Sequence, residues 1–145
     1  YLDVTVFSTP RSFTCDDFKR YMLDLSEPWP ASIVLASALR DGGRVKLATL
    51  NNESRELNVH RVRRFGLRAI FDVFFTSCWL GVRKPARQIY ERVLGMTQWE
   101  EEPQRALFVD DREQNLVPAR ALGMKTIHFQ SAEQLAGDLS KLGLI

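Results

Sequence analysis

The 145-residue sequence has little cysteine, no long apolar run and no excess of either charge. Its two cysteines, Cys15 and Cys78, are too few for a disulfide framework in a domain of this size, and they show no metal-ligand spacing. No apolar stretch approaches the ~18 residues that cross a bilayer, and no basic segment followed by an apolar one opens the chain. We therefore expect a cytoplasmic protein that does not bind a membrane.

The balance of charge argues against a polyanionic partner. Lys and Arg number 20 against 18 Asp and Glu, and the two signs are interspersed along the chain. Binding to nucleic acid requires a concentrated basic surface, so we expect none. The 45% hydrophobic and 26% charged residues are typical of one globular domain, which buries roughly 70% of its unfolded surface. The sequence gives no indication of the oligomeric state.

An initiator methionine is also lacking, although the first residues already have the pattern of ordered structure. We therefore expect a truncated chain whose natural form continues upstream.

Hydrophobic periodicity predicts helices and strands that alternate from residue 45 to the end. Thr14 with Asp17 and Ser131 with Gln134 are typical helix starts, whereas Gly43 and Gly66 stand where helices end. Short apolar strands that alternate with amphipathic helices specify an α/β fold with a parallel sheet and helices on both faces. Helices are expected over 14–25, 30–41, 53–65, 85–94, 118–122 and 131–142, and strands over 45–50, 71–77, 106–109 and 126–129.

Polar residues follow three of these strands directly, where ligands of parallel sheets gather. They are Asn51-Asn52, the 77–84 loop that ends in Lys84-Pro85, and Asp110-Asp111. Adjacent carboxylates repel unless a cation compensates them, and hard oxygen ligands of this kind suit Mg²⁺. Lys84 could neutralise both a phosphate and the carboxylates, and the asparagine amides could donate to the same oxyanion.

Each of these features taken alone also has a purely structural explanation. One aspartate could cap the following turn while the other is solvated, and Lys84 could be an exposed cation of a loop. Asn51-Asn52 could hold the N-cap of the next helix.

The order of the three features resembles the haloacid-dehalogenase-like (HAD) hydrolase superfamily, in particular its haloacid-dehalogenase and epoxide-hydrolase-like branch. Leu47-Ala-Thr-Leu-Asn-Asn52 is similar to the second motif of that family, Lys84-Pro85 to the third, and Phe108-Val-Asp-Asp111 to the fourth. The stretch from Asn115 to Met124 also fits. The resemblance covers about residues 30–145, which would be an incomplete three-layer, Rossmann-like core, and residues 1–29 look like the last part of a helical cap.

The resemblance implies a role for each matching residue. Asp110 and Asp111 would bind Mg²⁺, Lys84 would hold the nucleophile and the transferring phosphoryl group, and Asn51 would clamp a phosphate oxygen, with Asn52 beside it. The sequence departs from the family at Asn51, where Ser or Thr is usual, and at Ala86, where Asp is common. An amide still donates to an oxyanion, so Asn51 changes the geometry more than the chemistry.

The Asp-x-Asp motif that supplies the family's nucleophile occurs nowhere in the sequence. Asp3-Val-Thr-Val-Phe7 is a poor substitute, because its Asp precedes the apolar residues, and we assign it to the cap. The missing first strand would lie between the strands that end at Asn51 and Asp110, so we expect this chain to be incompletely packed and inactive by itself.

The resemblance implies a Mg²⁺-dependent phosphatase of small phosphorylated metabolites that acts through an aspartyl-phosphate. A 2-haloacid dehalogenase and a non-catalytic HAD-like binding domain are the alternatives. A phospho-acceptor receiver domain is disfavoured, because receivers place the Asp pair before Lys-Pro, and here Lys84-Pro85 comes first.

Two further groups of residues have ordinary structural explanations. The basic cluster 61–64 is predicted to be a solvated helix face. Trp29, Trp79 and Trp99 are predicted to be packing anchors.

Overall fold

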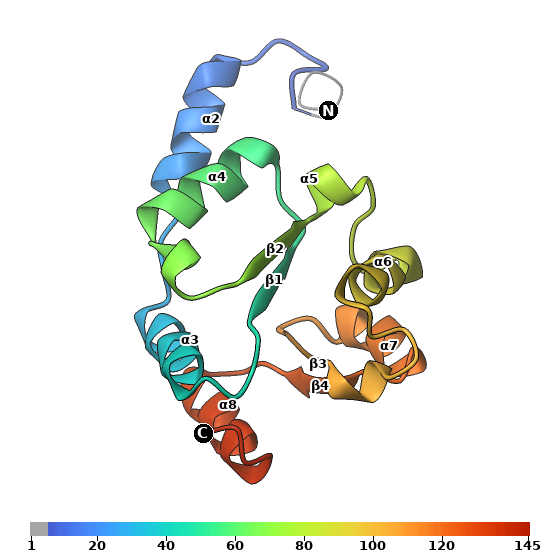
Figure 1. The fold of residues 1–145 in the computed structure, drawn as a ribbon. Coiled ribbons are helices and arrows are strands. Elements are labelled where there is room, and N and C mark those ends of the chain that lie inside the picture. The colour runs from blue at the N-terminus through green and yellow to red at the C-terminus, as the bar shows by residue number, and fades with distance from the viewer. Residues whose placement is uncertain (1–5) are drawn as a thin grey trace.

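A computed structural model describes residues 6–145, which fold as an α/β protein with helices around parallel strands (Figure 1). The segment at Asp3 lies partly outside the described residues. The elements are α2 (Cys15–Asp24), α3 (Pro30–Gly42), β1 (Ala48–Asn51), α4 (Arg55–Arg64), η1 (Leu67–Ala69), β2 (Val73–Thr76), α5 (Ser77–Leu80), α6 (Arg87–Thr97), η2 (Pro103–Arg105), β3 (Leu107–Asp110), α7 (Glu113–Ala121), β4 (Lys125–His128) and α8 (Ala132–Lys141).

The strands form two separate parallel pairs, β1 with β2 and β3 with β4. The register places Asn51 opposite Thr76 in one pair and Asp110 opposite His128 in the other. Within residues 6–145, β1 and β3 each have a hydrogen-bonded neighbour on one side only. The expected parallel sheet is therefore present as two halves, as a core without its central strand would be.

The main hydrophobic core lies between α6, α7 and strand β3 (Figure 1). Ile89, Tyr90, Leu116 and Ala119 are completely buried there. Tyr90 and Phe108 pack edge to face with ring centroids 5.5 Å apart. This core fixes β3, and with it the position of Asp110.

Helices α2 and α3 begin where the sequence predicts. The Thr14 hydroxyl accepts a hydrogen bond from the Asp17 amide, and the Asp17 carboxylate accepts one from the Thr14 amide, which completes the capping box. Pro30 occupies the first turn of α3, and Gly43 ends that helix with φ +65°, a value that side chains disfavour. Neither helix contains a buried residue.

Three local expectations were wrong. The helix predicted at 118–122 begins at Glu113, so Pro118 lies inside α7 rather than in its first turn. The loop predicted over 77–84 contains the short helix α5. Trp29 and Trp79 are 67% and 54% exposed, whereas Trp99 does pack against the core.

Candidate functional site

Lys84 and Asp110 form an ion pair at the carboxyl ends of the strands. Lys84 Nζ lies 2.6 Å from Asp110 Oδ2, and the two side chains are only 11% and 5% exposed. The ammonium also lies over the ring of Phe108, 5.4 Å from its centroid. Because both charges are largely withdrawn from water, each needs the other for neutralisation. The fold thus brings together two predicted site residues from different segments.

The second oxygen of Asp110 is held from the side of α7. Asp110 Oδ1 accepts hydrogen bonds from the Arg112 amide at 2.9 Å and from Asn115 Nδ2 at 2.8 Å. Asn115 is itself buried, and its backbone carbonyl accepts a hydrogen bond from the Tyr90 hydroxyl at 2.6 Å. The orientation of the Asp110 carboxylate is therefore fixed by three donors besides the packing around it.

These contacts set the ionisation of the buried groups. Burial raises the pKa of Asp110, but hydrogen bonds from Lys84, Asn115 and the Arg112 amide outweigh it and hold the pKa below its ordinary value. Burial, with the Asp110 charge nearby, raises the pKa of Tyr90 to about 12. Asp110 is therefore an anion and Tyr90 a neutral donor at neutral pH.

Asn52 joins the first strand pair to Lys84. Its Nδ2 donates to the Lys84 carbonyl at 2.8 Å, and its Oδ1 accepts from the Lys84 amide, also at 2.8 Å. Asn51 ends β1 half-buried, and its side chain forms no hydrogen bond within residues 6–145. Asn52 thus fixes the backbone that carries the ammonium, whereas the Asn51 side chain makes no hydrogen bond to Lys84 or Asp110 within the described residues.

Asp111 is the least constrained member of the predicted set. It is exposed, and its carboxylate makes no hydrogen bond or ion pair within the described part of the chain. Its backbone carbonyl lies 2.9 Å from His128 Nε2, at the end of β4. The backbone at Asp111 is held while its carboxylate remains available.

The donor chemistry of Asp110 and Asp111 fits Mg²⁺, because this ion is commonly bound by one or two carboxylates and keeps water or substrate oxygens as its other ligands. The described residues contain no group of three or more His, Cys, Asp or Glu side chains arranged to hold a metal. Further ligands would have to come from water, from substrate or from outside residues 6–145.

Sequence reasoning missed Asn115 and Tyr90 as parts of the site. The sequence pattern predicts a helix only over 118–122, so Asn115 enters there solely as the first residue of the stretch 115–124 that resembles the family. A helix that begins at Glu113 places Asn115 in its first turn, five residues after Asp110, and this spacing was the available signal.

Comparison with known proteins identifies the family. The model of the haloacid dehalogenase-like hydrolase family matches residues 6–123. The chain therefore belongs to the haloacid dehalogenase-like hydrolases, and its α/β architecture is the Rossmann-like core of that family.

Curated relatives include a flavin mononucleotide hydrolase of Arabidopsis thaliana, 40% identical over 54% of this chain and 31% of its own length. Bifunctional epoxide hydrolase 2 of Rattus norvegicus is 30% identical over 93% of this chain and 24% of its own length. A pyrimidine 5'-nucleotidase of Escherichia coli is 32% identical over 53% of this chain. The matches thus span about a quarter to a third of these relatives.

Solved structures have the same fold. A HAD-like hydrolase from Porphyromonas gingivalis aligns with a TM-score of 0.75 at 24% identity, over 91% of this chain and 66% of that one. A HAD family enzyme mutant from Bacteroides thetaiotaomicron, solved with magnesium and inorganic phosphate, aligns with a TM-score of 0.73 at 16% identity, over 89% and 66%.

None of the helices within residues 6–145 has the length and apolar character that a membrane crossing needs. The cytoplasmic location expected from the sequence stays a prediction.

Proposed function

We propose that this chain supplies the phosphate-binding and metal-binding part of a Mg²⁺-dependent phosphatase that acts on small phosphorylated metabolites. The observation that carries the proposal is the buried contact between Lys84 Nζ and Asp110 Oδ2 at the carboxyl ends of the strands. A cation and a carboxylate oriented by its own donors suit phosphoryl transfer, because catalysis there consists mainly of positioning and charge stabilisation.

Each site residue has a distinct part in the proposal. Lys84 holds a phosphoryl oxygen while Asn52 keeps its backbone in place. Asp110 and Asp111 hold Mg²⁺, which when bound neutralises charge on the phosphate. Asn51 donates its amide to a phosphate oxygen from the end of β1.

The nucleophile comes from a strand outside this chain, placed between β1 and β3. These strands each have one open side within the described residues, so a parallel strand fits between them. A carboxylate at the end of that strand attacks phosphorus, and the bond from phosphorus to the leaving alcohol breaks. Water then hydrolyses the acyl phosphate to inorganic phosphate and the free carboxylate.

We further propose that residues 1–29 belong to the last part of a helical cap and residues 30–145 to the core. Helix α2 packs against α4, at the end of the molecule farther from α8 (Figure 1).

Relatives named for their substrates support the substrate class. They are a flavin mononucleotide hydrolase, a pyrimidine 5'-nucleotidase and a sesquiterpene phosphatase from Aspergillus oryzae. Each name specifies a small molecule with a phosphate group.

The roles are tested by steady-state hydrolysis of an aryl phosphate in the natural protein that contains this chain. Lys84→Met is expected to lower kcat by at least about 100-fold, whereas Lys46→Met, at an exposed lysine before β1, leaves it unchanged. Asp111→Asn is expected to raise the Mg²⁺ concentration needed for half-maximal rate. Full activity of Lys84→Met would overturn the assignment of Lys84.

A further inference from the structure

Arg61 is part of a polar network, contrary to the prediction that cluster 61–64 is a solvated face. Its Nε donates to Ser26 Oγ at 2.6 Å, and its Nη1 is paired with Glu53 Oε1. Ser26 is 1% exposed and the Glu53 side chain 10%. Arg61 therefore connects two groups that are far apart in the sequence and almost inaccessible to water.

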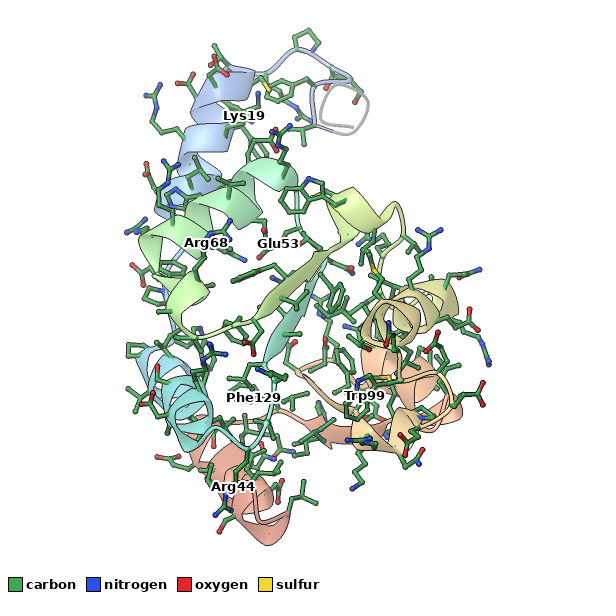
Figure 2. The ribbon with its side chains drawn as sticks, viewed as in Figure 1. Lys19, Arg44, Glu53, Arg68, Trp99 and Phe129 are labelled. Carbon is green, nitrogen blue, oxygen red and sulfur yellow. The ribbon has the colours of Figure 1, made fainter. Side chains whose placement is uncertain are left out.

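Glu53 is the end of this network nearer the candidate site. Its Oε2 accepts from Asn58 Nδ2 at 2.9 Å, and its backbone amide donates to Ser77 Oγ at 3.2 Å. Figure 2 shows Glu53 where the chain passes from β1 toward α4. Because Glu53 directly follows Asn52, its position limits that of the amide that holds the Lys84 backbone.

Ser26 is the other end of this network. It lies in the segment 25–29 between α2 and α3, which we call the α2–α3 joint. Its amide donates to the Leu23 carbonyl at 3.1 Å, close to the end of α2. Arg64 Nη1 lies 3.5 Å from the same carbonyl. Two arginines of α4 thus reach the end of α2.

We propose that Arg61 is a positioning residue that transmits the position of the α2–α3 joint, through Glu53, to Asn52 and the Lys84 backbone. A planar guanidinium can bind two partners at fixed angles, which a lysine ammonium on its flexible stem does not do. The partners are buried, so moving the joint away leaves polar groups unsatisfied unless Glu53 moves as well. A displacement of α2 therefore alters the candidate site.

The test is a double-mutant cycle read by hydrogen exchange at the Lys84 amide, which is bonded to Asn52 Oδ1. Ser26→Ala is introduced into the unmodified chain and into an Arg61→Met chain. The amide of Leu139, in α8, reports global unfolding in the same samples. Arg63→Met is the matched control, because Arg63 forms no ion pair within residues 6–145.

We expect Ser26→Ala to speed exchange of the Lys84 amide roughly threefold relative to Leu139 when Arg61 is present, and to have no effect in the Arg61→Met chain. Arg63→Met should leave the effect of Ser26→Ala intact. An equal effect of Ser26→Ala with and without Arg61, or none in either, would overturn the proposal.

Arg61→Lys replaces Arg61→Met if the latter does not fold. It keeps the charge beside Glu53 but cannot hold Glu53 and Ser26 together, so it should also abolish the effect of Ser26→Ala. Because no substrate or metal is involved, failure of this test is distinct from failure of the proposed phosphatase activity.

Discussion

The two strand pairs are supported to very different degrees by the helices around them. Around β3 and β4, helices α6 and α7 bury residues such as Ile89 and Leu116 completely. On the other side, α4 buries Asn58 and Val62, but α2 and α3 contain no buried residue. Tyr21, Trp29 and Val34 are each at least 60% exposed.

The two strand pairs also differ in how well their buried polar groups are hydrogen-bonded. The buried carboxylate of Asp110, beside the packed core, has partners for both oxygens. In the other pair, the hydroxyls of Thr49 and Thr76 are buried without a hydrogen-bond partner within the described residues. Buried polar atoms are normally paired, so the β1–β2 half has the features of a structure that lacks a neighbour. The candidate site therefore lies between a well-packed half and a half in which buried hydroxyls have no partner within the described residues.

The largest expected effect is loss of the Lys84–Asp110 ion pair on the well-packed side. Asp110→Ala leaves the Lys84 ammonium and the Asn115 amide without their acceptor, so the free energy of unfolding should fall by about 4 kcal/mol. Asp111→Ala, at the exposed neighbour, should change it by less than about 0.5 kcal/mol. Urea denaturation measures both, and equal effects of the two changes would contradict the distinction between them.

Removing a side chain from a helix should also destabilise the β3–β4 half more than the β1–β2 half. Leu116→Ala removes a fully buried side chain from α7 and should cost about 3 kcal/mol of unfolding free energy. Val34→Ala, on α3, removes a side chain that is 68% exposed and should cost under about 0.5 kcal/mol. If Val34→Ala lowered the free energy of unfolding as much as Leu116→Ala, the Val34 side chain would have to be packed against another segment in solution.

Tyr90→Phe should have an intermediate effect with a distinctive pH dependence. Loss of the hydroxyl removes its hydrogen bond to the Asn115 backbone carbonyl in a buried site and should cost about 1.5 kcal/mol at neutral pH. Since the folded pKa of about 12 lies above the ordinary value of 10, the contribution of Tyr90 is full below pH 10 and is lost as the pH rises toward 12. Thermal unfolding over pH 9–12 should show this loss in the unmodified chain and in Tyr21→Phe, but not in Tyr90→Phe.

The smallest expected effect has opposite signs in the two strand pairs. Thr76→Val replaces an unpaired buried hydroxyl with a methyl group and should stabilise the chain by about 1 kcal/mol. Thr126→Val removes the acceptor of Arg120 Nε, at 2.7 Å in β4, and should destabilise it by about 0.5 kcal/mol. If Thr76→Val also destabilises the chain, its hydroxyl has a partner in solution.

Much of the fold could be predicted because local patterns specify alternating strands and helices. The ends of parallel strands meet at one edge, so the sequence order alone indicated that Lys84 and Asp110 lie close together. The predicted start of α7 was wrong because a proline inside a helix removes one backbone hydrogen bond, which favours placing Pro118 in the first turn. Complete burial of Leu116 and Ala119 on either side of it compensates that loss, and burial of this kind depends on distant segments.

The role of Arg61 could not be predicted for a related reason. Its charge pattern along α4 is typical of a solvated face, and both of its partners come from other segments of the chain. Contacts between Ser26, Glu53 and Arg61 exist only after α2 and α4 have packed together. Local pattern therefore specified the elements, whereas contacts between segments specified the polar network beside the site.

The proposed phosphatase function is tested most directly by turnover of an aryl phosphate with and without Mg²⁺, comparing this 145-residue chain with a chain extended upstream to its natural start. We expect Mg²⁺-dependent turnover in the extended chain and none in the shorter one. Turnover by the 145-residue chain would contradict the claim that its nucleophile lies elsewhere, and inactivity of both would favour a non-catalytic binding domain.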